Sequence, residues 1–199
     1  MTLKLAPSVA VGPGDALVVA DVQRDFLPGG ALAVAHGDEV IALLNRCLAE
    51  WRARGLPIIL TRDWHPPDHC SFQARGGSWP PHCVAGTKGA AFDPRLAAPA
   101  SAIVISKATE REREAYSAFE GTDLDSCLRA ARVRRVFVGG LATEYCVLAT
   151  VRDALARGFG AVVLVDAIRA IEAHPGDGRR AEEEMVRLGA TLVHQLPDS

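Results

Sequence analysis

The chain alternates between short runs of apolar, often β-branched residues and longer stretches in which apolar residues recur at helical spacing. The short runs predict strands at residues 16–21, 57–61, 102–106, 135–139, 161–165 and 191–194. The longer stretches predict helices over residues 38–54, 123–131, 143–157 and 178–188. A repeated strand, helix, strand order is typical of a parallel sheet covered by helices. We therefore expect an α/β fold in one domain over residues 1–199, with a parallel sheet of about six strands and helices on both faces.

Composition narrows the classes of protein to which this chain can belong. Apolar residues make up 49% of it, and 22 basic against 24 acidic residues give a formal net charge of −2. Such a chain can fold around a core, and it lacks the excess of Lys and Arg that nucleic acids and acidic membranes attract. The longest apolar runs, such as residues 16–20, have five residues, whereas a bilayer span needs about 20. We therefore expect no nucleic-acid partner, no membrane segment and, since no signal peptide is legible, a cytoplasmic protein.

The cysteines are odd in number and form no CxxC pair: Cys47, Cys70, Cys83, Cys127 and Cys146. A chain of this length can build its own core and does not need disulfides for stability. Each cysteine is therefore expected to be either a small core residue or a nucleophile.

Reactive side chains follow the predicted strands at the edge where parallel sheets bind their ligands. Asp21 ends the first strand, Lys107 follows the third, and Cys146 comes shortly after the fourth. We predict that Cys146 lies in the first turn of a helix with Thr143 as its N-cap, where helix amides and Lys107 lower the thiol pKa. Asp21 could then take the thiol proton, which gives a nucleophile, a base and an electrostatic helper. The alternatives are structural: a buried helix thiol, a turn-forming carboxylate and a surface cation.

Asp63 and His65 follow the second strand, and their i, i+2 spacing lets both side chains face one metal ion. They lie at the start of a loop, residues 64–99, that is rich in Pro, Gly and His, and loops of this length are usually functional. His69 and His82 from this loop are available as further ligands, and a carboxylate with two imidazoles suits Zn, Fe or Mn. The alternative is a set of loop histidines with structural hydrogen bonds. The remaining histidines are expected to be ordinary surface or strand-end residues: His36, His174 and His194.

Five segments can be read together over most of the chain: VVADVQRDFLPGGAL, TRDWHPPDHCSF, WPPHCVAGTKGAAF, ISKATE followed by AYSAFEGTDL, and VGGLATEYCV. In this order they resemble the nicotinamidase (pyrazinamidase) branch of the isochorismatase-like cysteine hydrolases. The resemblance implies the isochorismatase-like hydrolase fold. It also implies a catalytic triad of Asp21, Lys107 and Cys146.

The same resemblance implies that Asp63, His65 and His82 are metal ligands. We expect one divalent ion there, zinc before iron or manganese. Some relatives recruit an additional histidine from a longer loop after DWH. His69 is therefore a doubtful ligand, and we expect it to orient its neighbours instead.

The resemblance also implies how the substrate is held. The expected substrate-binding residues are Phe26, Trp79, Tyr116 and Leu141. The Leu141–Ala142 peptide is expected to be cis, which leaves the backbone amides of Ala142 and Cys146 as the oxyanion hole.

The implied activity is hydrolysis of nicotinamide, and of pyrazinamide, to the acid and ammonia through a cysteine thioester, in NAD salvage. The partner would be a small pyridine carboxamide, and a homo-oligomer is left open. A second interpretation is another cysteine amidase of this fold that acts on carbamoyl or ureido compounds, although such substrates have less need of the metal ligands. A third, from a different class, is a metal-binding or redox-sensing protein, although Cys146 has no second cysteine close by in the sequence.

Overall fold

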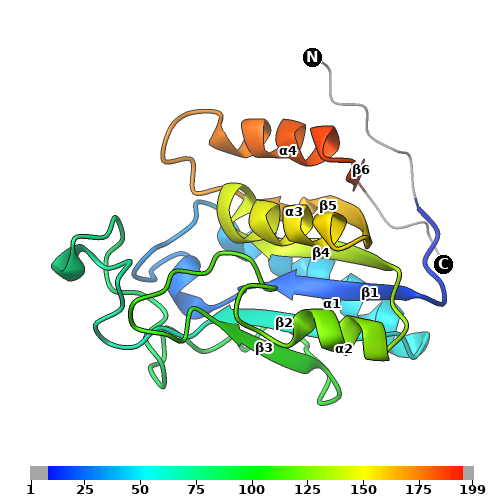
Figure 1. The fold of residues 1–199 in the computed structure, drawn as a ribbon, viewed down its shortest axis with the longest axis horizontal. Helices are drawn as coiled ribbons and strands as arrows, with labels where there is room; N and C mark the ends of the chain where they lie inside the picture. The colour runs from blue at the N-terminus through cyan, green and yellow to red at the C-terminus, as the bar shows by residue number, and fades with distance from the viewer. Residues whose placement is uncertain (1–8, 195–199) are drawn as a thin grey trace.

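The computed structural model describes residues 9–194, whose arrangement is shown in Figure 1. Their strands are β1 (Asp15–Ala20), β2 (Ile58–Asp63), β3 (Ile103–Lys107), β4 (Arg135–Leu141), β5 (Gly160–Arg169) and β6 (Thr191–Val193). These form one parallel sheet of six strands in the order β3-β2-β1-β4-β5-β6. The α-helices are α1 (Val40–Ala53), α2 (Leu124–Ala130), α3 (Leu148–Ala156) and α4 (Asp177–Arg187). The predicted α/β fold with a parallel, six-stranded sheet is confirmed.

The central strand β1 has the sequence DALVVA and is buried along its whole length. Alternate side chains of a strand point to opposite faces of the sheet. Accordingly, Leu17 and Val19 belong to the core under α1, and Val18 belongs to the core under α2, α3 and α4. This burial on both faces explains why the strand is a continuous apolar run and not an alternating one.

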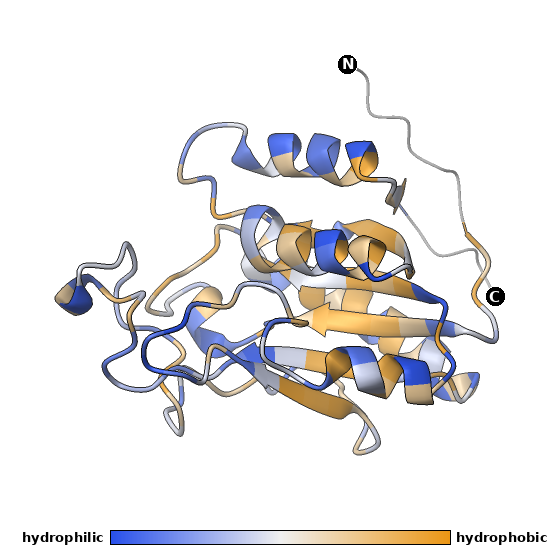
Figure 2. Ribbon diagram, in the orientation of Figure 1, coloured by the Kyte–Doolittle hydropathy of each residue, from blue (hydrophilic) through white to orange (hydrophobic). Residues whose placement is uncertain are grey.

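Helix α1 covers one face of the sheet, and α2, α3 and α4 cover the other, with their more polar sides turned outward (Figures 1 and 2). The predicted helical spacing places Leu44 and Trp51 on the buried side of α1, where the Trp51 and Phe137 ring centroids are 5.0 Å apart. The buried side chains of the other helices include Leu128, Val151 and Met185. Within residues 9–194, every helix is too short or too polar to span a lipid bilayer.

Strand β5 is longer than the predicted strand at residues 161–165. It continues to Arg169 because its second half pairs with the end of β4, after a change of register between Val138 and Gly140. Such an irregularity bends a strand locally. The extension brings the chain after β5 to the carboxyl edge of the sheet.

The predicted helix over residues 143–157 is divided in the structure. A π-helical turn, Thr143–Val147, comes first, and α3 follows it. The carbonyl oxygen of Ala142 accepts hydrogen bonds from the amides of Tyr145 at 3.1 Å and Val147 at 3.2 Å, and the second bond spans five residues as a π-helix requires. The prediction of Thr143 as N-cap is wrong, because Thr143 already lies inside the turn and Ala142 takes the capping position without a side-chain hydrogen bond.

Strands β1 and β4 form the topological switch point of the sheet. From β1 the chain passes to β2 and β3 on one side, and it then returns to β4 on the other side of β1. The two strands approach closely there: a Cβ atom on Gly140, whose φ is +123°, would lie 2.0 Å from the carbonyl oxygen of Ala20. Open α/β sheets bind their ligands beyond the carboxyl ends of the strands at such a point.

Candidate active site

Asp21 follows β1 directly and lies at the switch point. Its φ of +50° is rare for a residue with a side chain, and it turns the chain out of the strand direction. The Thr61 hydroxyl donates to Oδ1 at 2.6 Å, and Oδ2 lies 3.0 Å from Nζ of Lys107. Burial raises the pKa of Asp21, with Lys107 opposing the shift and Asp63 reinforcing it. A carboxylate with a raised pKa is a better proton acceptor than a surface carboxylate.

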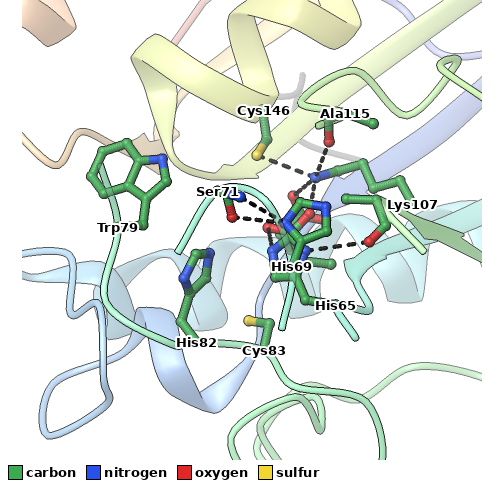
Figure 3. A network of polar contacts seen from close by, with 12 residues as sticks. His65, His69, Ser71, Trp79, His82, Cys83, Lys107, Ala115 and Cys146 are labelled. Atoms are coloured by element: carbon green, nitrogen blue, oxygen red, sulfur yellow. Dashed lines mark hydrogen bonds and ion pairs between the residues drawn. The ribbon is translucent and has the colours of Figure 1, made fainter. Parts of the chain in front are cut away.

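Lys107 ends β3, and its side chain is completely buried at the centre of the cluster in Figure 3. Nζ contacts Oδ1 of Asp63 and lies 3.0 Å from Oδ2 of Asp21. It also lies 3.3 Å from Sγ of Cys146 and 3.5 Å from the carbonyl oxygen of Ala115. Burial alone would lower the pKa of Lys107, but the carboxylates of Asp21 and Asp63 raise it well above its usual value. The ammonium group therefore stays charged between its anionic neighbours.

Cys146 lies in the π-helical turn after β4 and is 4% exposed. Its Sγ atom lies within 4.8 Å of a carboxylate oxygen of Asp21. Burial raises the pKa of the Cys146 thiol well above its usual value; Lys107 opposes this shift, and Asp21 and Asp63 add to it. The prediction of a lowered thiol pKa is wrong, because complete burial and two carboxylates outweigh a single ammonium. The resting group is a thiol with a proton acceptor beside it.

Asp63, His65 and His82 are buried, and their donor atoms lie within 4.8 Å of one another. Nδ1 of His65 lies 3.3 Å from the Ala108 carbonyl oxygen, and Nδ1 of His82 lies 2.8 Å from that of Pro80. Because a carbonyl can only accept, these contacts assign the ring proton to Nδ1 and leave Nε2 with a lone pair. Nε2 of His65 has no hydrogen-bond partner in the described part of the chain. A buried, unpaired imidazole nitrogen beside a carboxylate and a second imidazole fits a divalent metal ion.

The Asp63 carboxylate joins this metal site to Lys107. Its Oδ1 contacts Nζ of Lys107, and its Oδ2 lies 3.7 Å from Nε2 of His65. Burial alone would raise the pKa of Asp63, but the Lys107 ammonium holds it well below its usual range. Burial lowers the pKa of His82, which favours the neutral imidazole that a metal ligand requires.

His69 lies outside this set of donors, as expected. Its Nε2 donates to the Arg113 carbonyl oxygen at 3.0 Å, and its Nδ1 accepts from the Ser71 hydroxyl at 2.8 Å. With both nitrogens bonded, the ring packs against His65 at a centroid distance of 4.3 Å. His69 therefore supports the His65 ring. The remaining histidine side chains are largely exposed: His36, His174 and His194.

A small cavity opens beside Cys146. It is lined by Phe26, Leu32, Asp63, Trp79, His82, Tyr116, Ala142, Tyr145, Cys146 and Ile171. Apolar and aromatic side chains with a few polar groups are typical of sites for small molecules. The lining of this cavity therefore suits a small molecule.

Trp79, Tyr116 and Tyr145 form an aromatic wall of this cavity. Nε1 of Trp79 donates to the Tyr116 hydroxyl at 2.9 Å. The Tyr145 ring packs against Trp79 at 5.1 Å and against Tyr116 at 5.5 Å between centroids. Aromatic side chains of this kind offer flat surfaces on which a planar ring can pack.

The structure brings three of the four predicted substrate-binding residues to the cavity, namely Phe26, Trp79 and Tyr116. It places the fourth, Leu141, elsewhere: this side chain is fully buried in the core under α1 and does not line the cavity. The Leu141–Ala142 peptide is cis, as predicted. Ala142 itself lines the cavity next to Cys146.

The sequence reasoning missed three lining residues: Leu32, Tyr145 and Ile171. Tyr145 directly precedes Cys146, so its place in the ATEYCV segment could have indicated it. Ile171 follows β5 at the carboxyl edge of the sheet. The predicted strand ends at residue 165, so the sequence did not place Ile171 near that edge. Leu32 lies in a loop, where no periodic pattern marks it.

Comparison with known proteins agrees with this geometry. Residues 15–194 match the model of the isochorismatase domain family. The chain is 38% identical over 201 residues to the nicotinamidase of Escherichia coli (strain K12), which covers 90% of this chain and 94% of that protein.

Two solved structures share the fold. The pyrazinamidase of Pyrococcus horikoshii in complex with zinc has a TM-score of 0.88 and 50% identity, covering 92% of this chain and 100% of that chain. PnC1 from L. infantum in complex with nicotinate has a TM-score of 0.84 and 36% identity, covering 94% of this chain and 96% of that chain. The chain therefore belongs to the isochorismatase family, in its nicotinamidase and pyrazinamidase branch.

Proposed function

We propose that this protein is an amidohydrolase that converts nicotinamide, and also pyrazinamide, to the corresponding acid and ammonia, as a step of NAD salvage. The observation that carries the proposal is the buried cluster of Asp21, Lys107 and Cys146 beside a small cavity with an aromatic wall. The relatives support the substrate class. One is a nicotinamidase, one is a pyrazinamidase, and a third binds nicotinate, which is the acid that this reaction releases.

Cys146 is the nucleophile in this mechanism. Asp21 takes the thiol proton while Sγ forms a bond to the carboxamide carbon, and the raised pKa of Asp21 suits it to this transfer. The backbone amides of Ala142 and Cys146 stabilise the negative charge on the oxygen, and losing such a contact typically costs about 10²–10³ in rate. The intermediate then collapses: the C–N bond breaks, Asp21 returns its proton to the leaving nitrogen, and ammonia departs from an acyl thioester.

Hydrolysis of the thioester uses the same groups. Asp21 takes a proton from a water molecule as its oxygen attacks the thioester carbon, and the C–S bond then breaks. The proton passes from Asp21 to the Cys146 sulfur, which restores the thiol and releases the acid. The Lys107 ammonium keeps its charge throughout because the neighbouring carboxylates raise its pKa, so it stabilises negative charge in both steps.

Asp63, His65 and His82 would hold one divalent metal ion, zinc before iron or manganese. One carboxylate and two imidazoles with room for further ligands form a common catalytic zinc set, and the P. horikoshii pyrazinamidase binds zinc. When bound, the ion supplies a Lewis acid toward the ring nitrogen of a pyridine amide. The aromatic wall of Trp79 and Tyr116 packs against the ring, which orients the carboxamide toward Cys146.

Hydrolysis of ureido or carbamoyl acids by the same cluster is the weaker alternative. Such an acid carries a carboxylate, and binding sites usually meet a carboxylate with Arg or Lys. Among the described residues that line the cavity there is no Arg or Lys. The Lys107 ammonium nearby already contacts Asp21 and Asp63. The cavity therefore favours an uncharged amide.

The proposal is tested by measuring ammonia release from nicotinamide, pyrazinamide and a panel of ureido acids under the same conditions. We expect kcat/KM to be highest for the two pyridine-type amides, with Cys146→Ala protein as the blank. Faster release from a ureido acid than from nicotinamide would overturn the substrate assignment.

We also propose a cytoplasmic location. All five cysteines are free, and they include the Cys146 nucleophile. Free thiols persist in reducing compartments such as the cytoplasm. Fluorescence microscopy of a tagged chain would test this location.

A further inference from the structure

The segment after β1 reads Asp21, Val22, Gln23, Arg24, Asp25, so acidic and amide side chains alternate along it. Asp21 belongs to the Cys146 cluster. The side chains of Gln23 and Asp25 take no part in the reaction described above. Each is bonded instead to a segment that carries metal ligands.

Gln23 is fully buried and uses its whole side-chain amide on backbone groups. Its Oε1 accepts from the Asp63 amide at 2.8 Å, and its Nε2 donates to the carbonyl oxygens of Asp63 at 2.8 Å and Ala90 at 2.9 Å. Strand β1 ends at Ala20 and no longer reaches the backbone of Asp63. The Gln23 amide therefore satisfies the two polar groups that a continuing β1 would otherwise pair.

This bonding fixes the peptide of Asp63 from both sides. On the other side, the Trp64 amide donates to the Lys107 carbonyl oxygen at 3.1 Å. With the backbone held, the Asp63 carboxylate points one oxygen at Lys107 and the other toward His65. Gln23 thus sets the direction of a metal-ligand carboxylate without contacting it.

Asp25 binds the backbone of the segment that carries the metal ligand His82. Its Oδ2 accepts from the Cys83 amide at 2.7 Å, and Cys83 directly follows His82. The Cys83 carbonyl oxygen accepts in turn from the His65 amide at 3.0 Å, which links the two histidines through the backbone. The loop around Gly89 packs closely against Asp25: a Cβ atom on Gly89 would lie 2.1 Å from the Asp25 carboxylate.

We propose that Gln23 and Asp25 are positioning residues that hold residues 63–65 and His82 at the spacing a divalent ion requires. The inference rests on the metal site of the proposed function and adds the residues that build it. Neither side chain lines the cavity, so neither is expected to touch the substrate. Loss of such supporting partners typically weakens metal binding about 10–100-fold.

The chain offers a matched control in Asn45 on α1. Like Gln23, it uses its side-chain amide to bond to backbone groups: Oδ1 accepts from the Ala97 amide at 2.8 Å, and Nδ2 donates to the Arg95 carbonyl oxygen at 2.9 Å. These two bonds hold the end of the 64–99 loop at residues 95–97, away from the metal ligands. Its loss should affect stability but not metal binding.

The experiment compares Gln23→Met, Gln23→Glu and Asp25→Ala with Asn45→Leu and Asn45→Asp. Met removes the amide at similar volume, and Glu keeps the shape of Gln but cannot donate to two carbonyls. The dissociation constant for Zn²⁺ is measured on metal-free protein by competition with a chromogenic chelator, and the visible spectrum of Co²⁺-loaded protein reports the coordination geometry. We expect the Gln23 and Asp25 variants to bind Zn²⁺ about 10–100-fold more weakly with an altered Co²⁺ spectrum, and the Asn45 variants to stay within about twofold of wild type.

Wild-type Zn²⁺ affinity in Gln23→Met and Asp25→Ala would overturn the inference. Equal weakening in the Asn45 variants would also overturn it, because the loss would then reflect general destabilisation. If Gln23→Met fails to fold by circular dichroism, Gln23→Glu tests the role of Gln23. If Asp25→Ala fails to fold, Asp25→Asn replaces it: its side-chain carbonyl can still accept from the Cys83 amide, so we expect a loss of Zn²⁺ affinity of less than tenfold, and unchanged affinity would overturn the role of Asp25. Wild-type protein that binds no Zn²⁺ would remove the metal site and this inference, whereas ammonia release from nicotinamide tests the reaction separately.

Discussion

Strand β1 begins at one aspartate, Asp15, and is followed by another, Asp21, and the two carboxylates lie in different surroundings. Asp15, at the amino end, accepts two hydrogen bonds from Arg135, Nε to Oδ1 at 2.8 Å and Nη2 to Oδ2 at 2.7 Å. The Gly12 amide adds a third, to Oδ2 at 2.9 Å. Because the Arg135 side chain is 34% exposed, water screens this ion pair. Both oxygens of Asp15 are bound by fixed donors.

Asp21, at the carboxyl end, is completely buried, and the Thr61 hydroxyl donates to Oδ1. Its Oδ2 forms an ion pair with the Lys107 ammonium at 3.0 Å, and the Cys146 thiol lies beside the carboxylate. The Asp15 carboxylate is thus held by three donors, and its Arg135 partner is partly exposed to water. The carboxylate of the proposed active site is dry, has a raised pKa and keeps an oxygen available for a proton.

The largest effect on activity is expected from loss of the nucleophile beside Asp21, Cys146. Cys146→Ala should lower kcat/KM for nicotinamide by about 10⁴-fold or more, because no other group can form the thioester. Ammonia release measures the loss, and circular dichroism checks the fold. The matched control is Cys127→Ala on α2, which should keep full activity. Appreciable turnover by Cys146→Ala would show that another group attacks the amide.

The two ends of β1 are compared directly by Asp21→Asn and Asp15→Asn. Asp21→Asn should lower kcat by about 10²–10⁴-fold, because the general base is lost. Its melting temperature at neutral pH should not fall: the raised pKa means that ionised Asp21 destabilises the folded state relative to the unfolded chain, and Asn carries no charge.

Asp15→Asn should show the opposite behaviour. We expect normal kcat and a loss of about 1 kcal/mol or less in the free energy of unfolding, since the ion pair is screened. Thermal melts and ammonia release on both variants provide the comparison. Similar loss of activity in the two variants would contradict the division into a structural and a catalytic aspartate.

The role of Lys107 as a charge is tested by the pH dependence of its variants. An ammonium favours the ionised forms of Cys146 and Asp21, so Lys107→Met should raise both pKa values. Because the pKa of the Cys146 thiol is raised, its alkylation by iodoacetamide should need alkaline pH in the wild type. In Lys107→Met the alkylation profile should shift to still higher pH. The acid limb of kcat/KM should shift in the same direction.

Lys107→Arg separates charge from shape. It keeps the cation but introduces a planar, bulkier group. We expect its alkylation profile to approach that of the wild type while its turnover remains low. Coincident profiles for wild type and Lys107→Met would show that Lys107 does not set the ionisation of the thiol.

Among the site residues, the smallest effect on turnover is expected from loss of the metal site. Chelation or His82→Ala should raise KM for nicotinamide about 10–100-fold with a lesser change in kcat, because the site positions the ring while Cys146 and Asp21 perform the reaction. Metal analysis of wild-type protein should give about one ion per chain. His174→Ala, at an exposed histidine, is the control. An unchanged KM in both His82→Ala and chelated protein would contradict this role.

The sheet could be predicted because strands buried on both faces, such as β1, appear in the sequence as continuous apolar runs. The end of β5 could not, because Asp166 and Arg169 interrupt the apolar pattern and the pairing with β4 resumes only after a change of register. The π-helical turn Thr143–Val147 was also missed. One short turn of hydrogen bonds that span five residues leaves no mark in the spacing of apolar side chains.

The reactive residues of the candidate site could be located because they follow strands whose carboxyl ends meet at one edge. The i, i+2 spacing of Asp63 and His65 likewise indicated their shared direction. The pKa of Cys146 could not be predicted, since it depends on how completely the folded chain excludes water from the thiol. The place of Leu141 depends on which face of β4 it occupies, and only the register of the sheet decides that.

Strand β3, which ends at Lys107, lies at the border of the sheet and, among the strands of residues 9–194, pairs with β2 alone. Two of its side chains, Ile103 and Val104, are 39% and 45% exposed, so little apolar surface holds it in place. Border elements of this kind open at a lower free energy than central strands. Detachment of β3 would carry the Lys107 ammonium away from the carboxylates of Asp63 on β2 and Asp21 after β1, and from the Cys146 thiol after β4, while the two cores stay packed. Inactivation of this protein is therefore expected to begin as fraying at one margin of the sheet, at temperatures where most backbone amides are still protected from exchange.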